Sequence, residues 1–128
     1  MIAVDTYAFL WLMQDSPRLS PAARAAIRMV PANEIVVSSI SLYEIAWLVQ
    51  RKRIEIGEPI SRFFAYIEAK FNILAPDGRI AISAAQLPAQ FPSDPFDRII
   101  AATALVADAP LVTADRNIRR SRALRTIW

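Results

Sequence analysis

The chain has 128 residues, of which 55% are hydrophobic, and a net charge of +3, which fits one folded domain with a hydrophobic core over residues 1–128. It contains no cysteine and no histidine, so disulfides, thiolate nucleophiles and histidine-based proton transfer or metal binding are excluded. Any hydrolytic chemistry must therefore use carboxylates, hydroxyls, Lys or Arg, and a hard divalent cation that prefers oxygen ligands is its natural helper.

The N-terminal segment predicts a strand over Met1–Val4, and Asp5 follows it directly. No basic region precedes an apolar stretch, and the apolar run Tyr7–Met13 is far shorter than the ~20 residues that span a bilayer. We therefore expect a cytoplasmic protein without membrane contact.

Short apolar runs then alternate with helical patterns along the chain. Further strands are expected at residues 34–38, 72–75 and 110–113, with a short fifth strand at 124–128, and helices are expected at about 20–30, 41–51, 59–71, 80–87 and 94–108. The strands show no polar alternation, which is typical of strands buried on both faces. The sequence thus predicts an α/β fold: a central parallel sheet of four to five strands flanked by helices.

Three helix starts carry capping signals. Ser20 precedes Pro21, and Asp94 precedes Pro95, which places a capping side chain before a proline at the first helical position. Ser41 and Glu44 have the spacing of a capping box. Other serines near the second strand, such as Ser38, are hydroxyls that can bond locally to the backbone.

Four carboxylates are expected at the carboxyl edge of the sheet, where open α/β folds place their sites. Asp5 and Asp115 follow the first and fourth strands, while Glu44 and Asp97 lie in the first turns of helices that begin at this edge. Two bare carboxylates at about 4 Å repel by ~4 kcal/mol at an effective dielectric of 20, and Mg²⁺ or Mn²⁺ would remove this cost. Each acid alone has an ordinary alternative role as a helix cap, a first-turn acid or a turn residue. Their common location favours a metal site with catalytic function.

Neighbouring polar residues are assigned supporting roles. Thr6, Ser41, Asp94 and Thr113 are expected behind the carboxylates, where they can orient them, although local backbone bonding is an equally good account of each hydroxyl. The C-terminal segment is rich in arginine, which indicates either a solvated face or phosphate contact. Arg98 and Arg116 each follow a proposed ligand and could brace it or meet a phosphate. The residues predicted to contact RNA are Arg98, Arg116, Arg119 and Arg120.

Together the motifs resemble PIN-domain ribonucleases, specifically VapC toxins of bacterial type II toxin–antitoxin modules. The resemblance spans nearly the whole chain and rests on the segments Ile2–Thr6, Ser38–Glu44, Asp94–Ala104 and Leu111–Asp115. It implies a PIN fold that holds Mg²⁺ or Mn²⁺ on the acidic quartet. Asp5, Glu44 and Asp97 match the three principal acidic positions of the family, and Asp115 matches the more variable fourth one.

The resemblance also implies partners. VapC toxins cleave structured cellular RNA, are usually homodimers and are neutralised by a cognate VapB antitoxin, and the complexes bind operator DNA through the antitoxin. We therefore expect an RNA substrate, a VapB-type antitoxin and a second copy of the chain as partners.

Two other functions stay open from the residues. A phosphoacceptor signalling domain also has an acidic α/β pocket, but it needs a late lysine, and the only lysines here are Lys52 and Lys70. A non-catalytic module that binds RNA through the basic C-terminal segment would not depend on Asp97. A haloacid-dehalogenase-type phosphatase is excluded, because it needs an aspartate two residues after the first one and position 7 is Tyr.

Overall fold

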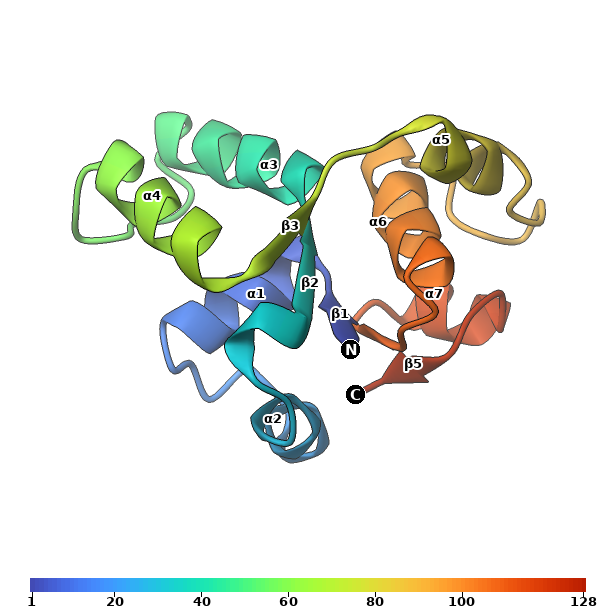
Figure 1. Ribbon diagram of the computed structural model, residues 1–128, viewed down its shortest axis with the longest axis horizontal. Coiled ribbons are helices and arrows are strands. Elements are labelled where there is room, and N and C mark those ends of the chain that lie inside the picture. Colours follow the sequence, from blue (N-terminus) through green and yellow to red (C-terminus); the bar gives the residue numbers. More distant parts are fainter.

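The computed structural model describes residues 1–128 and contains one parallel sheet of five strands in the order β3-β2-β1-β4-β5 (Figure 1). All five strands coincide with the expected ones and are shorter by one to three residues, which confirms the predicted parallel α/β fold. The strands are β1 (Ile2–Val4), β2 (Ile35–Ser38), β3 (Asn72–Leu74), β4 (Leu111–Val112) and β5 (Thr126–Ile127).

Seven α-helices and one short 3-10 helix surround the sheet. None of the helices has the length and apolarity that crossing a bilayer requires. The helices are α1 (Thr6–Met13), α2 (Pro21–Arg28), η1 (Ala32–Glu34), α3 (Ser39–Gln50), α4 (Ile60–Lys70), α5 (Gly78–Ala85), α6 (Pro95–Val106) and α7 (Arg116–Ser121). The sequence did not predict α7, because only Ile118 of its six residues is buried and no apolar repeat marks it.

The expected cap of α3 is wrong in its position. The helix begins at Ser39, and the hydroxyl of Ser38 accepts a hydrogen bond from the Ile40 N–H at 3.3 Å, so Ser41 lies inside the first turn rather than before it. The predicted caps Ser20 and Asp94 are confirmed, since the side chain of each accepts backbone N–H groups of the helix that follows. Ser41 therefore does not cap α3, and its hydroxyl is free to contact another element.

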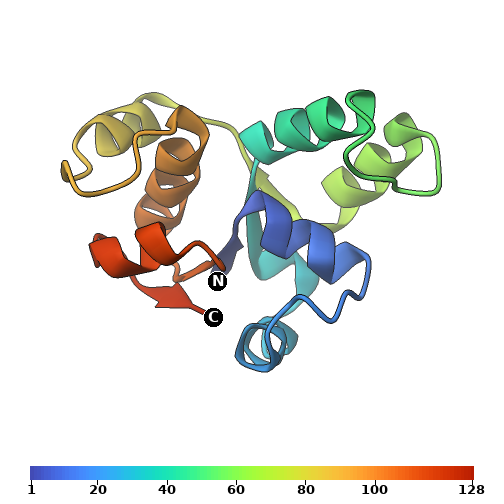
Figure 2. The same cartoon turned by 180° about the vertical axis from the view of Figure 1, so that it is seen from behind.

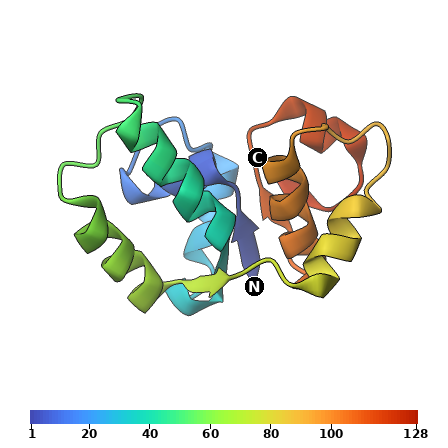
Figure 3. The same cartoon turned by 90° about the horizontal axis from the view of Figure 1, so that it is seen from above.

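Helices α1–α4 cover one face of the sheet and α5–α7 the other (Figures 1 and 2). Successive strand residues point to opposite faces, so Ile2 and Val4 of β1 join the core beneath α1–α4, whereas Ala3 joins the core beneath α6. The small side chain of Ala3 suits the alanines Ala101 and Ala104, which bring α6 close to the sheet. Figure 3 shows the sheet between these two groups of helices. Each group therefore has a hydrophobic core of its own, and the strands separate the two.

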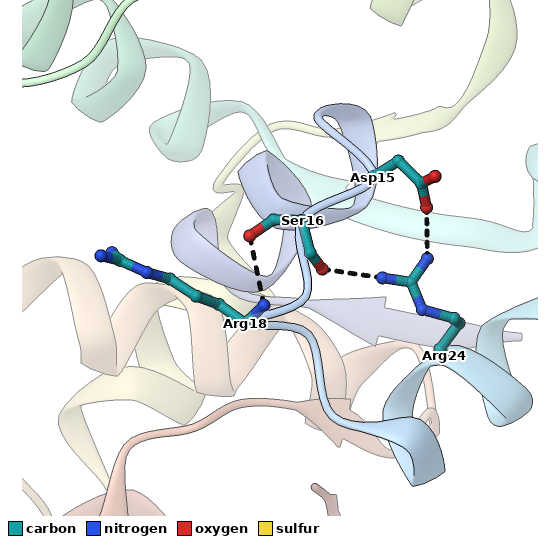
Figure 4. A network of polar contacts seen from close by, with 4 residues as sticks. All are labelled: Asp15, Ser16, Arg18 and Arg24. Atoms are coloured by element: carbon teal, nitrogen blue, oxygen red, sulfur yellow. Dashed lines mark hydrogen bonds and ion pairs between the residues drawn. The ribbon is translucent and has the colours of Figure 1, made fainter.

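The turn between α1 and α2 is held by one arginine (Figure 4). Asp15 takes the left-handed conformation with φ 48°, and Arg24 of α2 donates to its carboxylate at 2.6 Å and to the carbonyl of Ser16 at 2.7 Å. The hydroxyl of Ser16 accepts the N–H of Arg18 at 3.2 Å. This network closes the turn against α2, whereas the side chain of Arg18 points away from it.

The order of the strands determines where a site can form. The chain places β2 and then β3 on one side of β1, and later places β4 and β5 on its other side. The order reverses between β1 and β4, and at such a switch point the connections diverge and leave a crevice at the carboxyl ends of the strands.

Candidate functional site

A pocket of about 490 Å³ lies at this switch point, and five carboxylates line it. All four acids of the predicted quartet are among them, and Asp94 is the fifth. The remaining lining residues are Thr6, Tyr7, Trp11, Ile100 and Ala114, so no Lys or Arg reaches the pocket wall. The carboxylates therefore converge as the topology predicts. No cationic side chain in the pocket lining offsets their negative charge.

Asp5 and Asp115 follow the two central strands and cap the helices that come next. Asp5 accepts the N–H of Ala8 at 2.8 Å, and Asp115 accepts the N–H groups of Asn117 at 2.8 Å and Ile118 at 3.0 Å. In both residues Oδ1 is the capping atom, which leaves the second carboxylate oxygen free for other contacts. These acids thus carry the capping role considered from the sequence and also line the pocket.

The buried hydroxyl of Thr113 links these two acids. It accepts the N–H of Asp115 at 3.1 Å, and its hydrogen bond to Asp5 lowers the pKa of that carboxyl. Burial has the larger effect and holds the pKa of Asp5 above its usual range, with a smaller contribution from the charge of Asp115. Thr113 therefore lies behind the carboxylates, at the position proposed for it.

Asp94 and Asp97 come from the start of α6. Asp94 caps the helix by accepting the N–H groups of Phe96 at 2.8 Å and Asp97 at 3.3 Å. The carboxylate of Asp97, one turn into the helix, has no hydrogen-bond donor within the protein. Burial, followed by the charges of Asp94, Asp115, Glu44 and Asp5, raises the pKa of Asp97 to about 7. The negative charges of all the other pocket acids therefore act on Asp97, and its carboxylate accepts no hydrogen bond that would stabilise its charge.

Glu44 projects from α3 and is held by a chain of hydroxyls. The Oγ1 of Thr6 lies 2.8 Å from Oε1 of Glu44 and 2.9 Å from Oγ of Ser41, and both hydroxyl residues are buried. A hydroxyl has one proton, so Thr6 donates to the carboxylate while Ser41 donates to Thr6. Burial raises the pKa of Glu44, the bond from Thr6 lowers it, and the charges of Asp94 and Asp5 raise it further. Thr6 and Ser41 therefore orient Glu44, which is the supporting position predicted for both.

The chemistry of the donor set fits a hard cation. Every potential ligand is an oxygen, and mutual repulsion and burial raise the pKa values of three carboxyls, which a divalent ion would reverse. No three acidic side chains are arranged to hold an ion on their own. Mg²⁺ usually keeps several waters and binds one or two carboxylates directly, so a wider ring of acids is compatible with it.

Arg98 does not line this pocket, and its predicted contact with RNA stays a prediction. Its guanidinium donates to the carbonyls of Pro92 at 3.0 Å and Phe91 at 3.2 Å, approaches those of Ala84 and Leu87 at 3.5 Å, and lies over the ring of Phe91. These contacts use its donors to fold the connection between α5 and α6. Arg98 therefore positions the segment that leads into Asp94, whereas Arg116, Arg119 and Arg120 are exposed on α7.

Two aromatic residues of the pocket were not predicted from the sequence. Tyr7 and Trp11 lie on α1, and their rings pack at a centroid distance of 5.9 Å in the pocket wall. Their spacing of four residues in an otherwise apolar run was the available signal, since such a pair shares one helix face. The run Tyr7–Met13 is thus a helix with one face toward the site.

Comparison with known proteins agrees with this geometry. The family model for the PIN domain matches residues 2–124. Ribonuclease VapC22 of Mycobacterium tuberculosis is 35% identical over 129 residues, which cover 99% of this chain and 98% of the relative. A toxin–antitoxin complex from Klebsiella pneumoniae matches with a TM-score of 0.72 at 20% identity, over 98% of this chain and 97% of the other. VapBC2 from Rickettsia felis, bound to a DNA fragment from its promoter, matches with a TM-score of 0.70 at 18% identity, over 98% and 97%.

Proposed function

Because the chain belongs to the PIN-domain family, we propose that it is a divalent-metal-dependent endoribonuclease and the toxin of a VapBC-type toxin–antitoxin module. The observation that carries the proposal is the pocket in which five carboxylates meet without a cationic side chain. The full-length likeness to Ribonuclease VapC22 supports RNA as the substrate. The absence of histidine and cysteine leaves carboxylates, hydroxyls, Lys or Arg for hydrolysis, and no Lys or Arg lines the pocket.

Mg²⁺ or Mn²⁺ is the proposed cofactor, and Asp5, Glu44 and Asp97 are its proposed principal ligands, directly or through waters that the ion keeps. Asp115 is the proposed fourth ligand, and its second oxygen is free because only Oδ1 caps α7. When bound, the ion supplies an activated water and positive charge for the scissile phosphate. These four acids are also the proposed catalytic residues.

The protein's own side chains prepare the pocket for this task. Asp5 and Asp115 are fixed by backbone N–H groups, and Glu44 by Thr6, so each presents a carboxylate in one orientation. Asp97 has both oxygens free, and burial and the neighbouring charges raise its pKa, so a bound cation would stabilise its ionised form. Asp94 adds negative charge and orients the start of α6. Such preorganisation removes the cost of rearranging dipoles during the reaction.

The alternative functions have less support. A phosphoacceptor domain needs a lysine close to the acidic pocket, and neither Lys52 nor Lys70 lines it. A module that only binds RNA leaves the buried hydroxyl chain behind Glu44 and the free Asp97 unexplained. Cleavage therefore accounts for more of the pocket than either alternative.

Incubation of the purified protein with total RNA in Mg²⁺ or Mn²⁺ tests the proposal. Cleavage should occur with the metal, stop in EDTA, and fall by at least about 100-fold in Asp5→Asn and Asp97→Asn, because each removes a charged ligand. Asp108→Asn is the matched control, since that exposed acid lies outside the pocket and should leave the rate unchanged. Cleavage that persists in EDTA or in Asp97→Asn would contradict the metal mechanism. Mapping of the cleaved ends would identify the RNA.

The proposed partners are a VapB-type antitoxin and a second copy of the chain, with operator DNA bound only through the antitoxin. The matched toxin–antitoxin complexes, one of which is bound to a promoter DNA fragment, support this assembly. Two adjoining pockets between α1 and α4 share Met13 and Tyr66 and offer apolar side chains to an antitoxin helix. We infer that such a module acts in the cytoplasm.

Expression of the chain tests whether it is the toxin of such a module. Growth should arrest on expression, recover on co-expression of the antitoxin, and continue when Asp97→Asn is expressed instead.

Helix α3 contributes mostly to the core and offers little surface to a partner. Ile45 and Leu48 of α3 are buried at 0% and 5% exposure. Trp47 is exposed and lies beneath the guanidinium groups of Arg51 and Arg53 at 5.0 and 5.3 Å. Most apolar side chains of α3 are therefore buried inside the domain or covered by its own arginines.

A further inference from the structure

Four arginines form a cluster beside the carboxylate pocket. Arg116, Arg119, Arg120 and Arg122, here called the arginine cluster, are the only residues that line a surface pocket of about 440 Å³. All four are exposed, and none forms an ion pair with an acid of the chain. A concentration of positive charge without any internal partner is free to bind an external anion.

The fold of α7 gathers these side chains on one surface. Arg116 stands in the first turn, and Arg119 and Arg120 lie three and four residues later, so the three are neighbours on the helix surface. Arg122 ends the helix in the left-handed conformation with φ 53° and ψ 20°, which turns the chain back and leaves its side chain in the same pocket wall. The sequence run of arginines is thus converted into a compact surface.

Asp115 connects this surface to the carboxylate pocket. It lines that pocket and caps α7, and Arg116 follows it immediately. An adjoining pocket of about 330 Å³, which shares Arg120 with the cluster, is also lined by Asn117, Ser121, Gln90 and Pro92. The arginine cluster therefore begins one residue after the carboxylate pocket and shares Arg120 with a surface that carries amide and hydroxyl groups.

We propose that the arginine cluster binds the phosphate backbone of the RNA strand whose scissile bond lies in the carboxylate pocket. This inference rests on the proposed ribonuclease function and names the surface that holds its substrate. Planar guanidinium groups bind phosphate with two parallel hydrogen bonds, and arginine contacts dominate the affinity for nucleic acids. An acidic peptide is the weaker alternative, because protein interfaces are anchored by apolar and aromatic side chains and this pocket has none.

The arginine cluster can offset the repulsion between the carboxylate pocket and the phosphates of an RNA strand. A strand that approaches five carboxylates is repelled by them, and the arginine cluster supplies attraction at the adjoining surface. Asn117 and Gln90 of the adjoining pocket add groups that can bond to a ribose hydroxyl or a base edge. The cluster thus determines where the strand is held, while the carboxylates act on a single phosphate.

Fluorescence anisotropy with a labelled 12-nucleotide single-stranded RNA of mixed sequence, in EDTA, measures this binding without cleavage. Arg119→Gln/Arg120→Gln should weaken binding about tenfold and reduce the slope of log K against log salt by about 1.4, since each phosphate contact contributes about 0.7 for single strands. Arg116→Gln/Arg122→Gln should act in the same direction. Arg28→Gln/Lys52→Gln changes the net charge equally, but these exposed residues lie in α2 and in the turn after α3, among the helices on the other face of the sheet (Figure 1). That control should bind within about twofold of the unmodified protein.

Three outcomes would overturn the proposal. One is an equal loss of affinity in the control, which would show a general effect of charge. Another is unchanged affinity and salt slope in both arginine-cluster variants. The third is displacement of the RNA by a poly-glutamate peptide whose binding depends on the same arginines, which would identify an acidic protein segment as the ligand. Because EDTA is present throughout, a failure of metal-dependent cleavage leaves this measurement interpretable, and a failure of binding leaves the cleavage assay intact.

Discussion

The carboxylate pocket and the arginine cluster lie on either side of Asp115, and each gathers charges of one sign. In the pocket the charges are partly buried, so repulsion and desolvation raise the pKa values of Asp5, Glu44 and Asp97. The arginines are exposed, and water and salt screen their repulsion. Like charges therefore destabilise the fold where they are buried and cost little where they are exposed. The first region needs a cation to be fully ionised, whereas the second is stable as it stands.

The largest expected effect is a loss of stability of the metal-free protein as the pH rises. The pKa of Asp97 is about 7 in the folded protein and 3.8 as a free side chain, so the folded state binds its proton more tightly. The tighter proton binding stabilises the folded state. This stabilisation is complete below pH 3.8 and is lost as the pH rises through 7. The free energy of unfolding in EDTA, measured by urea titration, should fall by on the order of 2 kcal/mol between pH 5 and pH 8, less than the full pKa difference implies because the side chain is partly exposed and solvent screens its charge.

Asp97→Asn separates this effect from other titrations. The variant lacks the ionisable group and should be more stable than the unmodified protein at pH 8 in EDTA, although it loses cleavage. Saturating Mg²⁺ should restore stability to the unmodified protein at pH 8, because a ligand that binds only the folded state stabilises it. A flat profile from pH 5 to pH 8 in the unmodified protein would show that the pocket acids are not strained by burial.

The elements that position both regions differ in how far the sequence predicts them. The strands, and the carboxylates that follow them, were predictable because buried parallel strands are apolar throughout and topology places their ends at one edge. The start of α6 was predictable because Asp94 and Pro95 form a local signal. The structure confirms these positions, while the roles of the acids in metal binding and catalysis stay predictions.

Three features were not predictable, because they depend on contacts that sequence spacing does not encode. Ser38, Ser39 and Ser41 are similar cap candidates, and the cap depends on how far β2 extends before α3 begins. The orientation of Arg98 depends on carbonyls up to fourteen positions away, in a loop without a repeating pattern. Helix α7 owes its existence to the cap by Asp115 and to the burial of Ile118 alone.

A smaller effect inside the pocket is expected from Thr6→Val, which keeps the shape of the side chain and removes its hydroxyl. Ser41 would lose its buried acceptor and Glu44 its donor, so the free energy of unfolding should fall by about 1–2 kcal/mol at pH 7. The pKa of Glu44 should rise, since the bond from Thr6 lowers it. Thr126→Val in β5 is the matched control, because that hydroxyl has no hydrogen-bond partner in the protein. Equal losses in the two variants would assign the effect to packing.

The smallest expected effect concerns the arginine cluster and tests the other half of the comparison. Arg119→Gln/Arg120→Gln removes two exposed charges without internal partners, so the free energy of unfolding should change by less than about 0.5 kcal/mol at low salt. Any change should be an increase, because the variant relieves repulsion, and it should vanish as added salt screens the charges. A marked loss of stability would mean that these arginines hold α7 in place. In that case weaker RNA binding by the same variant would result from a distorted helix. The Arg116→Gln/Arg122→Gln variant would then test whether the arginine cluster binds RNA.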